Sequence, residues 1–64
     1  MKDYEKFGIK VGQVYARADG SKGRVEVINT ETYSDVGDVV VKDHSKEYRI
    51  DCFKLAVVRY YPIN

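Results

Sequence analysis

The sequence predicts an all-β domain in which five short strands form a small barrel. The chain has only 64 residues, β-branched residues alternate with polar ones, and clusters of glycine, aspartate and serine separate the alternating runs. A chain of this length buries only about 60% of the surface that it exposes when unfolded, so its core is small. Compact closure of the sheet is therefore expected to compensate for the small core.

The first strand is predicted after a lead-in segment, residues 1–10. This segment is too short for an independent helix, which is marginal below about 12 residues. Further on, Val14 and Ala16 alternate with Tyr15 and Arg17, which is the period of a strand with two different faces. A single domain is expected over residues 1–64, because the chain has no internal repeat and no linker.

A hairpin is predicted next. The stretch "DGSKG", residues 19–23, begins with an Asp-Gly pair that favours a turn with positive φ, and Gly23 supplies a second permissive position. Val25 and Val27 then alternate with charged residues in a second strand that continues towards "VINTETY". "SDVGD" interrupts this strand, "VVVK" forms the third, and "DHSKE" separates it from a fourth around "YRI".

The segment "IDCFKLAVVRYY" has two interpretations. Ile50, Phe53, Val57 and Tyr60 recur at helical spacing, which a helix would bury on one side. The β-branched and aromatic residues near its end favour a strand instead. We therefore predict that "DCFKL" forms a short 3₁₀ turn that plugs the barrel with Phe53 and Leu55, that "AVVRYY" forms the fifth strand, and that Pro62 ends it.

Three resemblances follow from this layout. Five short strands with a 3₁₀ turn before the last one resemble an SH3-like small barrel, a fold that implies no single function. The stretch "IKVGQVYARADGSKGRVEVI", with Gly12, Gly20 and Gly23 set among valines, resembles the KOW motif of ribosomal proteins and NusG-type transcription factors. That resemblance implies contacts with RNA or with proteins of transcription and translation, made near Lys22 and Arg24. The overall layout, from "GQVY" to "RYYPI", also resembles small proteins encoded by bacteriophages and prophages.

Charge and cysteine content narrow the classes of function. Eleven basic residues balance ten acidic ones, so any basic surface must be local. The single cysteine, Cys52, has no internal disulfide partner, which favours a reducing compartment. The sequence has no apolar run of membrane-spanning length, and its polar start lacks the apolar centre of a secretory signal. A cytoplasmic protein without membrane association is therefore expected.

No catalytic or metal-binding group is predicted. His44 lies in an expected hairpin connection without a nucleophile or a second histidine nearby, so it is interpreted as an exposed turn residue. Cys52 is expected to be a partly buried thiol that ionises with difficulty beside a carboxylate. Asp35 and Asp38 flank a glycine and are interpreted as turn-forming residues. We therefore expect no enzymatic activity, no cofactor and no metal.

A basic and aromatic face is the candidate binding site. Tyr15, Arg17 and Arg24 are predicted to share one solvent-facing side of the first two strands, with Lys22 in the joining loop. Aromatic rings interleaved with arginine stack on nucleobases and contact phosphates. The alternative explanation of the same residues is an ordinary exposed sheet face with cross-strand aromatic and charge pairs. The set is completed by Tyr33, Arg59 and Tyr60.

The leading hypothesis is a non-catalytic module that binds nucleic acid, or a protein that handles nucleic acid. The alternative is a protein-interaction module, such as a phage-encoded regulator or inhibitor that docks on a host protein through a strand edge or the tyrosine face. A third interpretation places Tyr15, Tyr33 and Tyr60 around a cationic side chain in a Tudor-like aromatic cage. The sequence does not choose between RNA, DNA and protein as the partner.

Overall fold

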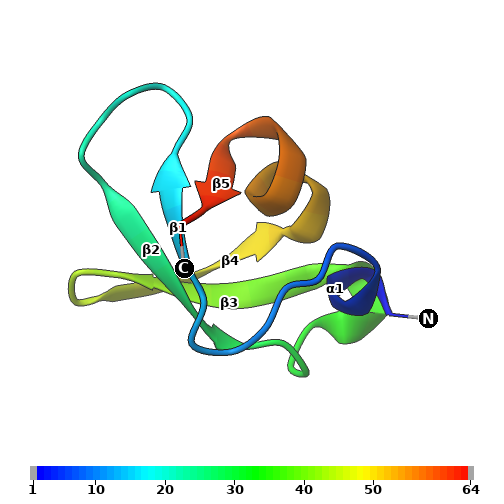
Figure 1. Cartoon of the computed structure of the whole chain (residues 1–64). Helices are drawn as coiled ribbons and strands as arrows, with labels where there is room; N and C mark the ends of the chain where they lie inside the picture. Colours follow the sequence, from blue (N-terminus) through cyan, green and yellow to red (C-terminus); the bar gives the residue numbers. More distant parts are fainter. Residues whose placement is uncertain (1, 64) are drawn as a thin grey trace.

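A computed structural model describes residues 2–63, and it confirms that the protein is mostly β. Five strands form one antiparallel sheet in the order β4-β3-β2-β1-β5 (Figure 1). The first four strands therefore pair in the order of the sequence, and the last strand returns to the first. The elements are α1 (Asp3–Lys6), β1 (Val14–Arg17), β2 (Arg24–Asn29), η1 (Ser34–Val36), β3 (Asp38–Asp43), β4 (Lys46–Asp51), η2 (Lys54–Val58) and β5 (Tyr60–Pro62).

The predicted hairpin between the first two strands is confirmed. Its turn is fixed by Asp19, whose Oδ1 accepts the backbone N–H of Ser21 at 2.9 Å, and by Gly20, whose φ of +88° favours glycine. Gly23 has a different role from the expected one, because its φ is not positive. A Cβ atom at Gly23 would lie 2.5 Å from Nε of Arg17, so this glycine makes room for that side chain.

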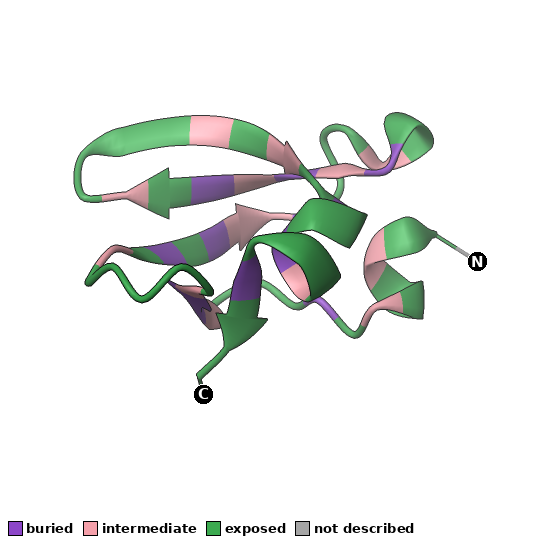
Figure 2. Cartoon of the chain, turned by 90° about the horizontal axis from the view of Figure 1, so that it is seen from above, coloured by how far each residue is buried: buried purple, intermediate pink, exposed green. Residues whose placement is uncertain are grey.

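The core lies against the central strands, where the alternation seen in the sequence is realised. Val25 and Val27 of β2 and Val39 and Val41 of β3 are all buried, and Val27 pairs directly with Val41. The pairing shifts between Val27 and Asn29, which marks an irregularity that bends the sheet. Figure 2 shows the buried residues as purple segments along the strands.

The third and fourth strands form a tightly connected hairpin. All six residues of β3 pair with the six of β4, from Asp38 with Asp51 to Asp43 with Lys46. His44 occupies the turn with φ +58°, and its side chain is 93% exposed. The interpretation of His44 as an exposed turn residue is therefore confirmed.

The lead-in segment contains one short helical turn, α1, and is attached to the sheet. Ile9 belongs to the buried core, and the Tyr4 hydroxyl donates a 2.6 Å hydrogen bond to Oε1 of Glu31. This bond to a carboxylate, together with burial, raises the pKa of Tyr4 to about 12. Tyr4 thus attaches α1 to the segment that follows β2.

The prediction for the last segment is wrong in its details. A helical turn begins at Cys52 and continues through η2, where the N–H of Arg59 donates to the carbonyl of Lys54, five residues earlier, at 2.8 Å. The turn is thus wider than a 3₁₀ turn, and residues 56–58 are helical rather than part of the fifth strand. Leu55 is fully buried as expected, whereas Phe53 is 51% exposed and does not plug the core. Pro62 ends β5 as predicted.

The local reason for this helical turn is a cap. Oδ1 of Asp51 accepts the backbone N–H groups of Phe53 and Lys54, at 2.8 and 3.3 Å, which are the donors that a helix start leaves unpaired. Burial of Leu55 then outweighs the strand preference of the neighbouring valines. The helical spacing noted in the sequence was therefore the better guide to residues 52–58.

The ends of the sheet approach each other without backbone pairing. Within residues 2–63, β4 and β5 are the two edge strands, and η2 lies between them (Figure 1). The hydroxyl oxygens of Tyr48 on β4 and Tyr60 on β5 lie 3.3 Å apart and share a hydrogen bond. The sheet is therefore curved but open, and the expected closed barrel is not formed by main-chain hydrogen bonds.

Among the described residues, no helix has the length and apolar character needed to cross a membrane.

Replacement of Leu55 by alanine tests the role of the helical turn in the core. Because Leu55 is fully buried, we expect Leu55→Ala to lower the free energy of unfolding by about 2 to 5 kcal/mol. Urea denaturation followed by circular dichroism measures the change. Val57→Ala, at an exposed position of the same turn, should stay within about 0.5 kcal/mol of the parent protein. Equal effects of the two substitutions would contradict the assignment of Leu55 to the core.

Candidate binding cleft

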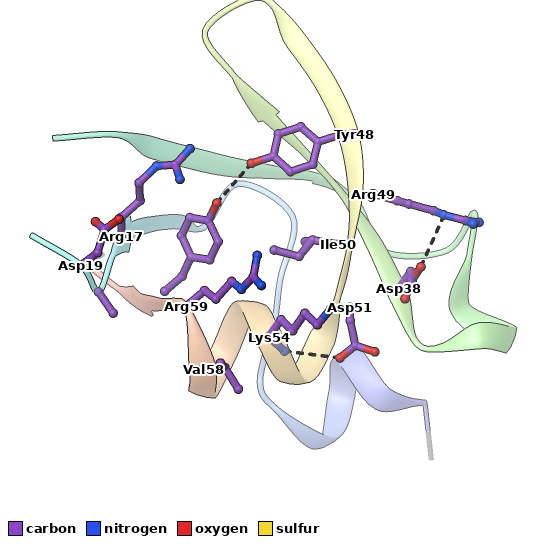
Figure 3. A pocket seen from close by; sticks show the side chains of 12 residues that line it. Arg17, Asp19, Asp38, Tyr48, Arg49, Ile50, Asp51, Lys54, Val58 and Arg59 are labelled. Carbon is purple, nitrogen blue, oxygen red and sulfur yellow. Dashed lines mark hydrogen bonds and ion pairs between the residues drawn. The ribbon is translucent and has the colours of Figure 1, made fainter. Parts of the chain in front are cut away.

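A hollow lies in the surface where the two edge strands approach. It has a volume of about 820 Å³, and side chains from β1, β4, η2 and β5 line it (Figure 3). Its less polar part is formed by Tyr48, Ile50, Val58 and Tyr60, and its cations are Arg17, Arg49, Lys54 and Arg59. Three carboxylates, Asp19, Asp38 and Asp51, also line it, so the charges nearly balance.

The tyrosine pair forms the inner end of the cleft. Tyr60 is buried, and the guanidinium carbon of Arg17 lies 5.7 Å from the centre of its ring. Burial and the hydrogen bond that it shares with Tyr60 together raise the pKa of Tyr48 to about 12. The Tyr48 hydroxyl is therefore protonated at neutral pH and acts as a hydrogen-bonding group.

Arg17 is held in place by the sheet. It pairs with Tyr60 in the β1–β5 ladder, and its NH2 group lies 3.4 Å from Oδ2 of Asp43. Gly23 leaves the space that the guanidinium stem needs. Both side chains of this ion pair are partly buried, so Asp43 largely compensates the charge of Arg17 within the protein.

Arg49 is positioned by an acid and a ring. Its Nε lies 3.5 Å from Oδ2 of Asp38, and its guanidinium carbon lies 4.8 Å above the centre of the Tyr33 ring. The side chain of Arg49 is nevertheless 57% exposed. An exposed ion pair contributes only about 0.2 to 1 kcal/mol, so a ligand can compete for this guanidinium.

Of the four cations that line the described cleft, Lys54 and Arg59 are the two without a carboxylate partner. Both residues are exposed, and within residues 2–63 neither side chain makes an ion pair or a hydrogen bond. Their main chains are well fixed, because the carbonyl of Arg59 also accepts the N–H of Ala18 at 2.8 Å. Figure 3 shows the two side chains extending along the cleft.

The carboxylates of the cleft have local partners. Asp51 caps the helical turn, and Asp38 pairs with Arg49. Asp19 accepts the backbone N–H of Ser21, which lowers the pKa of its carboxyl group. The uncompensated positive charges of the cleft are therefore those of Lys54 in η2 and of Arg59, the residue that follows η2.

The structure divides the residues predicted to share a face. Tyr15 is only 1% exposed, so its predicted solvent-facing position is wrong. It pairs with Val25 and points with it into the core, where a small domain needs large side chains. Its hydroxyl donates to Oε1 of Gln13 at 2.9 Å, which satisfies the buried polar group. Arg17 shares the inner face with Tyr15, but at the rim.

Arg24 and Lys22 lie away from the cleft. Arg24 pairs with Ala16, one position along from the inward-facing pair of Tyr15 and Val25, so it lies on the other face of the sheet. Its NH1 group donates to the carbonyls of Lys22 and Gly23, at 3.1 and 3.2 Å. The predicted common face of Tyr15, Arg17 and Arg24 is therefore not formed.

The aromatic cage is also not formed. Tyr15 and Tyr60 are buried, and Tyr33 lies outside the cleft with its ring covered by Arg49. The structure does bring together Arg17, Arg59 and Tyr60, which the sequence had singled out. It adds Arg49, Lys54 and Tyr48. The alternation of residues in "KEYRID" could have indicated that Tyr48 and Arg49 lie on a strand with two faces. Lys54 could not be placed from the sequence, because its segment had two interpretations.

The remaining candidates have structural roles. Cys52 is buried, and burial together with the nearby carboxylates of Asp3, Asp51 and Asp38 raises the pKa of its thiol to about 11. This confirms the expectation of a thiol that ionises with difficulty. Asp35 is exposed in η1 and lies 3.8 Å from Nζ of Lys2. In the part of the chain that the structure describes, no group of histidine, cysteine, aspartate and glutamate side chains has the geometry of a metal site.

No protein-family model, curated protein or solved structure matches the chain.

The raised pKa of Tyr48 predicts a pH dependence of stability. The unfolded chain loses this proton near the ordinary pKa of 10, whereas the folded protein keeps it to about 12. The folded state thus binds more protons between these values, and its stability falls as pH rises through them. We expect Tyr48→Phe to flatten this part of the curve of unfolding free energy against pH, measured by urea denaturation from about pH 9 upward.

The matched control is Tyr61→Phe, which removes an exposed hydroxyl from the same strand as Tyr60. The raised pKa values of Tyr4 and Cys52 leave some slope in every variant. A slope in Tyr48→Phe as steep as that of the parent protein would show that the hydroxyl pair does not couple stability to pH.

Thiol reactivity tests the burial of Cys52. We expect the folded protein to react with an aromatic disulfide reagent at about pH 8 only through transient unfolding, because the thiol is both inaccessible and protonated. Added urea should accelerate the reaction in step with the unfolded fraction. A rate in buffer equal to that of the denatured protein would be inconsistent with the buried position.

Proposed function

We propose that the protein is a small non-catalytic binding module with an SH3-like arrangement of strands, and that its ligand is single-stranded nucleic acid held in the cleft between β4, η2 and β5. The strand order β4-β3-β2-β1-β5, with a helical turn before the last strand, supports the SH3-like assignment. The KOW-like character of the first half, the phage origin and the cytoplasmic location stay predictions.

The free cations of the cleft carry this proposal. Lys54 and Arg59 have no anionic partner within residues 2–63, whereas Arg17 and Arg49 are paired with aspartates. Two unneutralised charges beside a partly apolar surface suit a ligand that presents phosphates and flat rings together. A single strand offers both, because its bases are not hidden in base pairs.

The charge balance sets the expected strength of binding. With a net charge of +1, the chain attracts nucleic acid only locally. Release of counterions by two phosphate contacts gives a slope of about −1.4 in a plot of log affinity against log salt concentration. The proposal is thus a weak, sequence-tolerant contact rather than strong phosphate binding.

Salt dependence of binding tests the proposal. We expect the affinity for a short labelled oligonucleotide to fall about sevenfold between roughly 50 and 200 mM salt. The double substitution Lys54→Gln with Arg59→Gln should weaken binding and nearly remove this dependence. Fluorescence anisotropy measures both effects.

The control variant removes the same number of positive charges at positions outside the cleft. Lys10→Gln with Lys46→Gln removes two exposed lysines that do not line the cleft. We expect this variant to bind nearly as the parent protein does. Absence of binding by the parent protein, or an equal loss in both double variants, would overturn the cleft as the nucleic-acid site.

A second candidate function is protein binding, favoured by one observation. Phe53 and Val57 expose apolar surface on the helical turn, where they are 51% and 57% exposed. Apolar residues exposed together are a feature of protein-interaction sites. Capture of a partner that survives nuclease treatment, is lost in Phe53→Ser with Val57→Ser and is kept in the cleft variant would favour this function.

A further inference from the structure

A second hollow adjoins the cleft at the free edge of β4. It has a volume of about 400 Å³, and its lining includes Asn29 at the end of β2 and Thr32 and Tyr33 from the segment that follows. Tyr48 and Arg49 line both hollows. The cleft and the second hollow therefore lie next to each other, with the edge strand β4 between them.

The register of the sheet places these two shared side chains on opposite faces. Tyr48 pairs with Val41, which is fully buried, whereas the adjacent Arg49 pairs with Val40. Neighbouring residues of a strand point to opposite sides. Tyr48 thus faces the cleft and Arg49 faces the second hollow. A chain-like ligand can pass from one to the other over the edge of the sheet.

The second hollow contains a flat platform. The guanidinium carbon of Arg49 lies 4.8 Å from the centre of the Tyr33 ring, and Tyr33 is 37% exposed. The loop that carries Tyr33 is fixed by Asn29, whose Oδ1 accepts the N–H groups of Glu31 and Thr32 at 2.8 and 3.0 Å. A planar guanidinium and an aromatic ring are both surfaces on which nucleobases stack.

We propose that Tyr33 and Arg49 form a nucleobase subsite, in which one base stacks on this platform while the adjoining phosphates follow Lys54 and Arg59 through the cleft. The inference rests on the proposed function and specifies how a strand lies on the protein. Stacking uses the face of a base, which all bases have, so the subsite accepts bases with little sequence preference. The charges of Lys54 and Arg59 hold the backbone, and Tyr33 distinguishes a strand with bases from a bare polyanion.

The test compares two oligonucleotides with the same number of phosphates. One is thymidine oligomer of about eight nucleotides, and the other is an abasic oligomer of the same length, a size within the range of known single-strand sites. We expect the parent protein to bind the oligomer with bases roughly 5- to 100-fold more tightly. A uridine oligomer serves as a third arm that separates RNA from DNA.

Substitutions then test whether Tyr33 and Arg49 cause the difference in affinity between the two oligomers. Tyr33→Ala should bring the ratio of the two affinities close to one, and Tyr33→Phe, which keeps the ring, should preserve it. Arg49→Lys keeps the charge but loses the plane, so it should lower the ratio while leaving the salt dependence unchanged. Lys54→Gln with Arg59→Gln should weaken both oligomers alike and leave the ratio intact.

Tyr61→Ala is the matched control, because Tyr61 is 50% exposed on β5 and lines neither hollow. Thermal unfolding of each variant establishes that it is folded. Equal binding of both oligomers by the parent protein would overturn the subsite and leave the proposed function standing. A ratio in Tyr33→Ala that stays as high as in Tyr61→Ala would also overturn it. If neither oligomer binds the parent protein, the proposed function itself fails.

Discussion

The approach of Tyr48 to Tyr60 joins the two ends of the sheet, and the site depends on it. An open five-stranded sheet leaves two edges, and here side chains rather than main-chain hydrogen bonds connect them. Leu55 is buried in the core, so that it anchors the helical turn that connects β4 to β5. The cleft exists because the sheet curves far enough to bring these tyrosines together but not far enough to pair the strands.

Electrostatic pairing within the fold decides which cations are available to a ligand. Arg17 and Arg49 are directed by Asp43 and Asp38, so their positions are well defined while their charge is largely compensated. Lys54 and Arg59 have fixed main chains and uncompensated side chains. This division explains how a nearly neutral protein can carry a local anion-binding surface. It also explains why counting basic residues along the chain did not locate that surface.

The sequence predicted most of the fold and only part of the site, for physical reasons. Alternating valines determined β2 and β3, because a strand with one buried face needs that period. Tyr15 was misplaced because alternation alone does not say which face is buried, and the face that it shares with Arg17 was interpreted as solvent-facing. The helical turn after β4 was underestimated, because a carboxylate cap and burial of Leu55 outweigh strand propensity there. Lys54 joined the site only through that turn.

The two unpaired edges of the sheet have a consequence for how copies of the protein meet. Exposed strand edges invite intermolecular pairing, which leads to aggregation. The outward-facing positions of β4 are occupied by Glu47, Arg49 and Asp51, and β5 ends in Pro62, which has no N–H to donate. Charge on one border and a missing donor on the other discourage fibre-like stacking. The charged edge of β4, which disfavours pairing with another copy of the sheet, is still accessible to a charged ligand.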